Sequence, residues 1–254
     1  MNLALSNFAW DNDESKVIFK TLKNNDIDNI ECVLTKIKSW DDLTIDDIKN
    51  YKKELKKQKI IPYSIQSLFY NVNTDNLCNN EKNIPHIKRL IEYSKILGIK
   101  ILVLGSPNLR KKINNWEKLI VEFFNEVDSL LKDTDIKLLI EPNSKVYNGE
   151  YFFKVSEIVE FINKYKFKNI LTMIDTHNSV LENKNPNIEY ANYYKYIKHI
   201  HISEPNLKVI EDNEFHKDFS NTLKKNNYNG VITYEVLKCD EIINNISTFS
   251  KIYK

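Results

Sequence analysis

Residues 197–206 read IKHIHISEPN, an apolar run that ends in an imidazole and then turns polar. Three further runs of this kind end in carboxylates: KLLIEPN at 137–143, LTMIDTHN at 171–178 and VITYEVL at 231–237. The side chains at these ends are Glu141, Asp175, His201 and Glu235. They follow one another at intervals of 26 to 34 residues, about the length of one strand and one helix. This spacing predicts parallel strands whose ends meet at one edge.

The same alternation of short apolar runs and amphipathic stretches continues over the whole chain. Eight runs rich in Ile, Val and Leu cover 2–9, 27–34, 60–69, 99–106, 136–143, 169–176, 197–203 and 230–237. Such runs are typical of strands buried on both faces. Between them, Thr44 and Asp47 form a helix-capping pair, and Pro85 and Gly98 are expected at the start and end of the next helix. The pattern predicts an α/β protein, a single-domain (β/α)8 TIM barrel over residues 1–254.

A doubly wound open sheet is the main alternative for such an alternation of strands and helices. In that fold a glycine-rich phosphate loop would follow the first strand. Residues 6–13 read SNFAWDND and contain no glycine, so they cannot form this loop. The barrel is therefore the preferred prediction.

The composition is that of a globular protein with nearly balanced charge. Hydrophobic residues make up 42% of the chain and charged residues 28%, and the formal net charge is +2. So small a charge gives no reason to expect a nucleic acid or a membrane as partner. Three widely spaced cysteines suit a reducing compartment, and the first residues lack the basic and apolar segments of a signal peptide. We therefore expect a cytoplasmic protein.

In a barrel of this type the carboxyl ends of the strands form the mouth where chemistry takes place. Each carboxylate at a strand end could instead cap the following helix. Four matched positions, however, indicate a site, because a carboxylate beside an apolar run is costly unless it is paired or bound to metal. Carboxylates with one imidazole favour Mn²⁺, Mg²⁺ or Co²⁺. Such an ion would polarise a carbonyl and hydroxyl pair while two glutamates move a proton at carbon.

The strings IEPN, MIDTHN, HIHISEPN and YNGVITYEV resemble the xylose isomerase-like TIM-barrel superfamily, in particular its sugar (phosphate) isomerase/epimerase branch with the ketose 3-epimerases. The resemblance implies a metal-dependent isomerase or epimerase of a small sugar. It implies that Glu141, Asp175, His201 and Glu235 bind one divalent ion, with Mn²⁺ expected and Mg²⁺ or Co²⁺ as alternatives. Glu141 and Glu235 would also be the catalytic acid/base pair. Family members are often oligomers, so a homodimer or tetramer is implied.

The resemblance also implies substrate-binding residues. The family usually has Asp, two residues and then His after the sixth strand, whereas here the imidazole of His177 comes one place early. Either His177 still reaches the substrate or Asn178 takes its place. Further candidates for substrate binding are Glu204, Asn206, Arg110 and His216. For these the alternative is a solvated or purely structural position, and for Glu31 a structural hydrogen bond is as reasonable as a place in the site.

Three other functions fit the same fold. One is a non-catalytic barrel that binds a sugar or a metal. Another is an endonuclease IV-like hydrolase, which would need several metals and more histidine ligands than five His residues provide easily. A third is a polyol dehydratase, in which the same enediolate expels a leaving group. The glutamates at the fifth and eighth strands favour the isomerase or epimerase.

Overall fold

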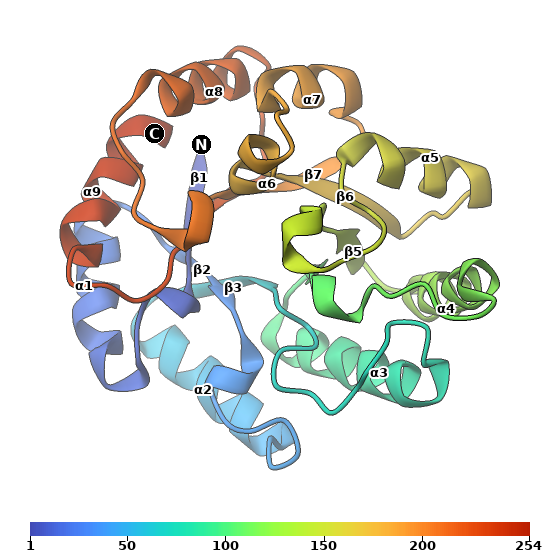
Figure 1. Ribbon diagram of the computed structural model, residues 1–254. Helices are drawn as coiled ribbons and strands as arrows, with labels where there is room; N and C mark the ends of the chain where they lie inside the picture. The colour runs from blue at the N-terminus through green and yellow to red at the C-terminus, as the bar shows by residue number, and fades with distance from the viewer.

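The computed structural model describes residues 1–254, and its centre is a closed barrel of eight parallel strands (Figure 1). The strands are β1 (Asn2–Ser6), β2 (Asn29–Cys32), β3 (Ile61–Ile65), β4 (Ile101–Leu104), β5 (Lys137–Ile140), β6 (Ile170–Asp175), β7 (Ile197–Ile202) and β8 (Val231–Tyr234). Each strand pairs with the next in sequence, and β1 closes the barrel on β8, with Leu3 opposite Ile232. The predicted (β/α)8 barrel is confirmed, and the open sheet is excluded.

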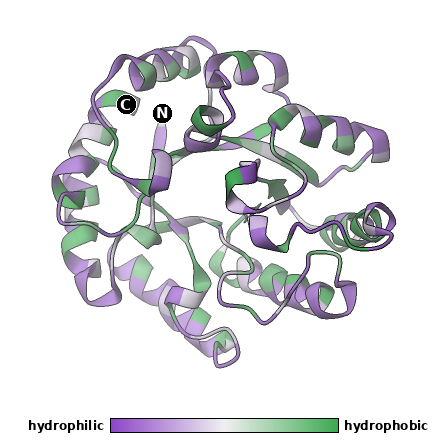
Figure 2. Ribbon diagram, viewed as in Figure 1, coloured by the Kyte–Doolittle hydropathy of each residue, from purple (hydrophilic) through white to green (hydrophobic).

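The helices surround the barrel, and all except the short α6, which lies at the mouth, cover the outer face of the sheet (Figure 1). They are α1 (Ser15–Asn24), α2 (Ile45–Lys57), α3 (Asn80–Leu97), α4 (Trp116–Leu131), α5 (Val155–Tyr165), α6 (Thr176–Leu181), α7 (Pro186–Tyr193), α8 (Glu214–Lys225) and α9 (Ile242–Tyr253). Figure 2 shows hydrophilic residues along their outward faces, as expected for amphipathic helices packed on a sheet. No helix combines the length and the apolar character that a transmembrane segment needs.

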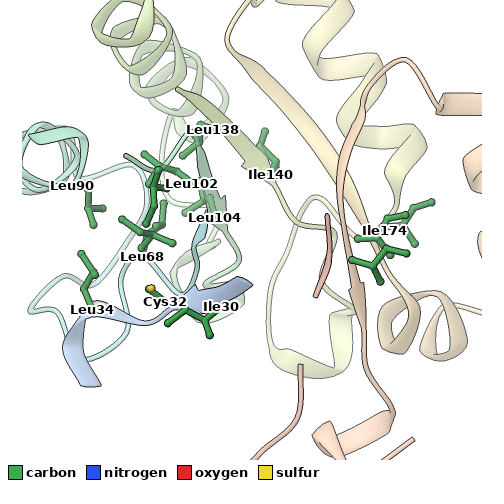
Figure 3. Close-up of a cluster of buried hydrophobic side chains, with 14 of the residues drawn as sticks. Ile30, Cys32, Leu34, Leu68, Leu90, Leu102, Leu104, Leu138, Ile140 and Ile174 are labelled. Carbon is green, nitrogen blue, oxygen red and sulfur yellow. The ribbon is translucent and has the colours of Figure 1, made fainter. Parts of the chain in front are cut away.

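Successive residues of a strand point to opposite sides of the barrel wall, so the core has two parts. Outward-facing side chains such as Leu102, Leu138 and Ile174 belong to a cluster of 63 buried residues beneath the helices (Figure 3). A second, smaller apolar cluster contains Ile101, Val103, Leu139 and Met173. Glu141 and Asp175 each follow a member of this cluster by two residues and therefore share its face. The polar layer thus lies directly above an apolar one.

The predicted helix ends are partly confirmed. The Thr44 hydroxyl accepts a hydrogen bond from the Asp47 backbone at 3.2 Å, and Asp47 accepts one from the Thr44 backbone at 2.9 Å. Gly98 ends α3 with a φ of 85°, which a residue without Cβ adopts readily. The prediction that Pro85 opens this helix is wrong, because α3 begins at Asn80. Proline is tolerated there because the carbonyl left without a partner, that of Glu81, belongs to an exposed residue of the first turn.

Candidate active site

Four consecutive strands bring Glu141, Asp175, His201 and Glu235 to one mouth of the barrel. Asp175 is the last residue of β6 and lies opposite His201 of β7 in the strand register. Glu141 and Glu235 directly follow β5 and β8, and their backbone amides still bond to the neighbouring strands, to Leu104 at 3.0 Å and Ile202 at 2.9 Å. The side chains are thus held by the barrel wall itself and not by flexible loops.

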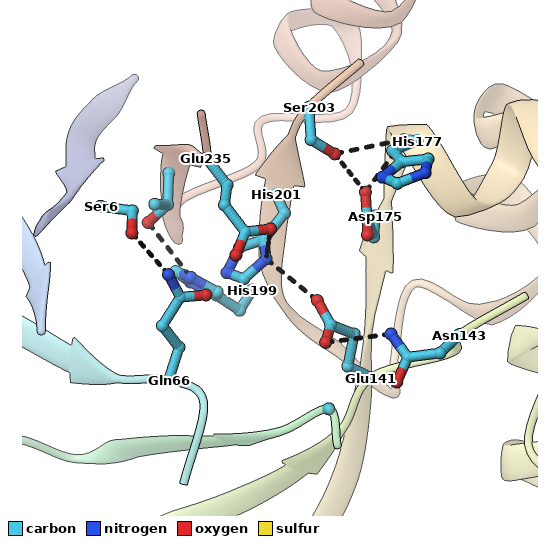
Figure 4. Close-up of polar contacts among 12 residues, drawn as sticks. Ser6, Gln66, Glu141, Asn143, Asp175, His177, His199, His201, Ser203 and Glu235 are labelled. Atoms are coloured by element: carbon cyan, nitrogen blue, oxygen red, sulfur yellow. Dashed lines mark hydrogen bonds and ion pairs between the residues drawn. The ribbon is translucent and has the colours of Figure 1, made fainter. Parts of the chain in front are cut away.

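The imidazole of His201 is the centre of this group and is fully buried. Its Nδ1 atom lies 3.1 Å from Glu141 Oε1 and 3.2 Å from Glu235 Oε2 (Figure 4). On the opposite side, its Nε2 atom lies 2.7 Å from Glu31 Oε2 at the end of β2. Glu31 also lies 3.0 Å from His199 Nε2 and accepts a hydrogen bond from Ser64 at 2.6 Å. His201 therefore lies between the carboxylate of Glu31 on its Nε2 side and those of Glu141 and Glu235 on its Nδ1 side.

Polar neighbours fix the other carboxylates. Asp175 accepts hydrogen bonds from the Ser203 hydroxyl and, at 2.9 Å, from the His177 backbone amide (Figure 4). The Asn143 side-chain amide donates to Glu141 Oε2 at 3.2 Å. Ser203 and Asn143 were not among the predicted site residues, although each lies two residues after one of the predicted ligands. Proximity in sequence was the only signal that could have found them.

A cavity of about 390 Å³ opens above these groups. It is lined by Glu141, Asn143, Tyr147, Asp175, His177, Asn178, Asn206, Leu207, Glu235 and Leu237. The Tyr147 hydroxyl and His177 Nε2 lie 2.5 Å apart, which joins the loop after β5 to the start of α6. The volume falls within the range of pockets that enclose small molecules.

The protonation states of the carboxylates differ. Burial, together with the charges of Glu141 and Asp175, raises the pKa of Glu235 to about 7. Burial also raises the pKa of Asp175. For Glu141 burial acts in the same direction, but the contact with His201 and its charge outweigh it and lower the pKa. Burial lowers the pKa of His201, but the charges of Glu31 and Glu235 raise it well above its usual value. In the metal-free site Glu141 thus favours the ionised form, whereas Glu235 gains and loses its proton near neutral pH, as suits an acid/base pair.

The raised pKa of Glu235 predicts a pH-dependent stability of the metal-free protein. Its pKa changes from 4.5 in the unfolded chain to about 7 in the folded one, so the folded state binds more protons between these values. Stability from this group is therefore present below pH 4.5 and lost as the pH rises through 7. In EDTA, the melting temperature of wild type relative to Glu235→Gln should fall between pH 5 and 8. Parallel curves for the two proteins would contradict this assignment.

The site has the ligand atoms that a divalent cation needs. One possible ligand atom each from Glu141, His201 and Glu235 lies within 4.8 Å of the others. His201 Nδ1 is buried and makes no well-aligned hydrogen bond, although two carboxylate oxygens are close to it. An imidazole nitrogen facing carboxylates in this way fits Mn²⁺, Mg²⁺ or Co²⁺. The carboxylate of Glu31 lies 2.7 Å from the other nitrogen, Nε2, where a carboxylate commonly stands behind a metal-binding histidine.

A model of the xylose isomerase-like TIM barrel family matches residues 19–246. The chain belongs to this family. The match includes seven of the eight strands and all four residues at the barrel mouth. The resemblance inferred from the strand-end strings is thereby confirmed. No curated protein matches this xylose isomerase-like barrel in sequence.

Solved structures share the barrel at low identity. A 3-keto-D-glucoside 4-epimerase from E. coli is 14% identical, with 99% of this chain and 97% of that chain covered and a TM-score of 0.77. A D-psicose 3-epimerase crystallised in the presence of D-fructose is 18% identical, with coverages of 100% and 90% and a TM-score of 0.76. An AP endonuclease, family 2, from Brucella melitensis is 15% identical, with 99% of both chains covered and a TM-score of 0.79. At these identities the likeness shows the fold alone.

Three predicted substrate-binding residues line the cavity: His177, Asn178 and Asn206. Because α6 begins at Thr176, directly after Asp175, both His177 and Asn178 lie in its first turn at the mouth. Both side chains therefore face the cavity. A substrate contact by His177 does not exclude one by Asn178.

Glu204 and His216 were expected to contact substrate, but neither residue lines the cavity. Glu204 Oε1 lies 2.7 Å from His216 Nε2, and the Tyr253 hydroxyl lies 2.8 Å from His216 Nδ1. His216 is fully buried, and both of its ring nitrogens have partners within the protein. The pair instead connects the loop after β7 to α8 and α9.

Arg110 is also placed differently from the prediction. Its guanidinium is fully buried and donates to the backbone carbonyls of Leu104 at 2.9 Å, Gly105 at 2.6 Å, Glu141 at 2.8 Å and Phe152 at 3.2 Å. No group of Arg110 lines the cavity. Its role in the structure is to tie the end of β4 to the end of β5.

Replacing Arg110 should therefore affect folding more than substrate binding. Arg110→Leu leaves several buried carbonyls without a donor and is expected to lower the free energy of unfolding by about 3 kcal/mol. Urea denaturation of the metal-free protein measures this. Unchanged stability combined with a raised KM would restore the substrate-binding role.

Proposed function

We propose that this protein is a divalent-metal-dependent isomerase or epimerase of a small sugar. The observation that carries the proposal is the position of two glutamates of different proton affinity beside the same nitrogen of one buried imidazole. Glu141 Oε1 and Glu235 Oε2 lie 3.1 and 3.2 Å from His201 Nδ1 at the floor of a cavity of about 390 Å³. Such a pair suits proton removal and return at a carbon next to a carbonyl.

Glu141, Asp175, His201 and Glu235 would hold the ion, with Mn²⁺ proposed first and Mg²⁺ or Co²⁺ as alternatives. When bound, the ion would polarise the carbonyl and the adjacent hydroxyl of the substrate. Glu141, whose pKa is lowered, is the proposed base that takes the proton from the substrate carbon. Glu235, whose pKa is about 7, is the proposed acid that returns a proton to the resulting enediolate. Return at the same carbon gives an epimer, and return at the neighbouring carbon gives an isomer.

Two of the similar structures are epimerases, one of a 3-keto-D-glucoside and one of D-psicose, which supports this class of reaction. The similarity to an AP endonuclease is as high in fold, but the cavity offers no cationic side chain to a DNA phosphate. A dehydratase would use the same proton abstraction and differ only in expelling a leaving group. The non-catalytic barrel is less well supported, because the pair of glutamates is complete.

Deuterium exchange tests the proposal directly. The Mn²⁺-loaded protein is incubated in D₂O with D-fructose, D-psicose, D-tagatose and L-ribulose, and the products are followed by NMR. Deuterium at a carbon next to the carbonyl is the expected result, and Glu141→Gln should abolish it. Absence of exchange in every ketose, with metal bound, would overturn the proposal.

A further inference from the structure

We infer that the substrate is a neutral polyhydroxy carbonyl compound without a phosphate or carboxylate group. The inference rests on the proposed function and narrows it. Three independent features carry it: the charges around the cavity, the N-termini of α6 and α8 at its mouth, and the apolar side of its wall.

The cavity is lined by three carboxylates, those of Glu141, Asp175 and Glu235, and by no lysine or arginine. A bound divalent ion would offset two of these charges and leave no positive excess. A phosphate ester carries a charge of about −2 at neutral pH, so it would meet no counter-charge inside the cavity. A neutral sugar has no such cost.

The cations near the mouth are already engaged or point to solvent. Arg110 is buried against backbone carbonyls. Lys238 lies 2.7 Å from Asp11 and 2.9 Å from Glu14, and Lys111 contacts the Asn148 carbonyl and lies 3.6 Å from Glu150. The remaining lysines of the loops after β5 and β7 do not line the cavity: Lys145 and Lys208 are exposed, and Lys154 is half-buried at the start of α5.

Two helix N-termini at the mouth, those of α6 and α8, are occupied by the chain itself. At α6 the Asp175 carboxylate accepts from the His177 amide at 2.9 Å, in the place where a phosphate would accept. At α8 the Asn213 side chain accepts from the His216 amide at 3.1 Å, and Glu214 adds a negative charge to the first turn. Neither helix therefore offers an anion site.

An apolar wall closes the side of the cavity formed by the loops after β7 and β8. Leu207 and Leu237 line it, and the Leu237 amide donates to the Leu207 carbonyl at 3.0 Å. Leu207 has a φ of 52°, an unfavourable value for this residue that persists only when its surroundings hold it. The two leucines fit the C–H face of a sugar and are unsuited to an anionic group.

The test compares kcat/KM of the Mn²⁺ enzyme for neutral ketoses (D-fructose, D-tagatose, L-ribulose) with that for D-fructose 6-phosphate and D-ribulose 5-phosphate. We expect the best neutral ketose to be preferred at least about 100-fold. Leu237→Arg, which adds a cation at the lip, should reduce this preference at least about tenfold, and Leu237→Gln should not. The double variant Lys145→Ala/Lys208→Ala should leave the preference unchanged.

Different outcomes would overturn the neutral-substrate inference and the proposed function. A preference for the phosphates, or a phosphate activity that disappears in the double lysine variant, would overturn the neutral-substrate inference and leave the proposed function intact. Failure of both classes to exchange deuterium would overturn the proposed function, and the inference with it.

Discussion

Glu141→Gln is expected to lower kcat roughly 10²- to 10⁴-fold, the usual contribution of a general base. The amide keeps the shape of the side chain and its contacts with Asn143 and His201, but it cannot accept a proton from carbon. Glu235→Gln should reduce kcat to a similar extent, because it removes the proton donor on the other side of the site. Both variants should also bind Mn²⁺ more weakly, since each loses a charged ligand.

Glu160→Gln is the matched control for these two variants. Glu160 lies exposed on α5, and its side chain makes no hydrogen bond or ion pair. Its variant should retain wild-type kcat and metal affinity. Near-normal turnover by Glu141→Gln, measured on the best ketose, would contradict the assignment of the acid/base pair.

Glu31→Gln is expected to weaken Mn²⁺ binding about 10- to 100-fold, although Glu31 does not line the cavity. The Glu31 carboxylate lies 2.7 Å from His201 Nε2, so it fixes which nitrogen carries the proton and leaves Nδ1 free for the ion. Glutamine preserves the volume but removes the negative charge behind the imidazole. Calorimetric titration with Mn²⁺ measures the change, and circular dichroism verifies the fold.

Glu204→Gln provides a close comparison for Glu31→Gln. It also replaces a carboxylate that contacts an imidazole, at 2.7 Å, but the histidine there is His216, outside the cavity. Its Mn²⁺ affinity should equal that of wild type. Equal Mn²⁺ affinities of Glu31→Gln and wild type would show that Glu31 has only a structural role inside the barrel.

The barrel and the four strand-end residues could be predicted because both depend on local patterns. Apolar runs at regular intervals set the strand order, and parallel strands place their carboxyl ends at one mouth. Helix ends were less predictable, as Pro85 shows: proline marks the first turns of α3 but does not specify its first residue.

The surroundings of the site depend on contacts between distant segments and could not be read from local sequence. Nothing near Arg110 in the chain indicates that its donors meet carbonyls 31 and 42 residues away. The same holds for His216, whose partner Tyr253 lies 37 residues further on. Tyr147, Leu207 and Leu237 come from loops, where sequence periodicity gives no guide to the direction of a side chain.

Titration of the metal-free protein with Mn²⁺, beside Asp175→Asn and Glu235→Gln, tests the central claim most directly. The account predicts one divalent ion per chain in the wild type, with binding weakened in both variants and unchanged in Glu160→Gln. No bound ion in the wild type, or equal binding in all four proteins, would contradict a metal site at the barrel mouth.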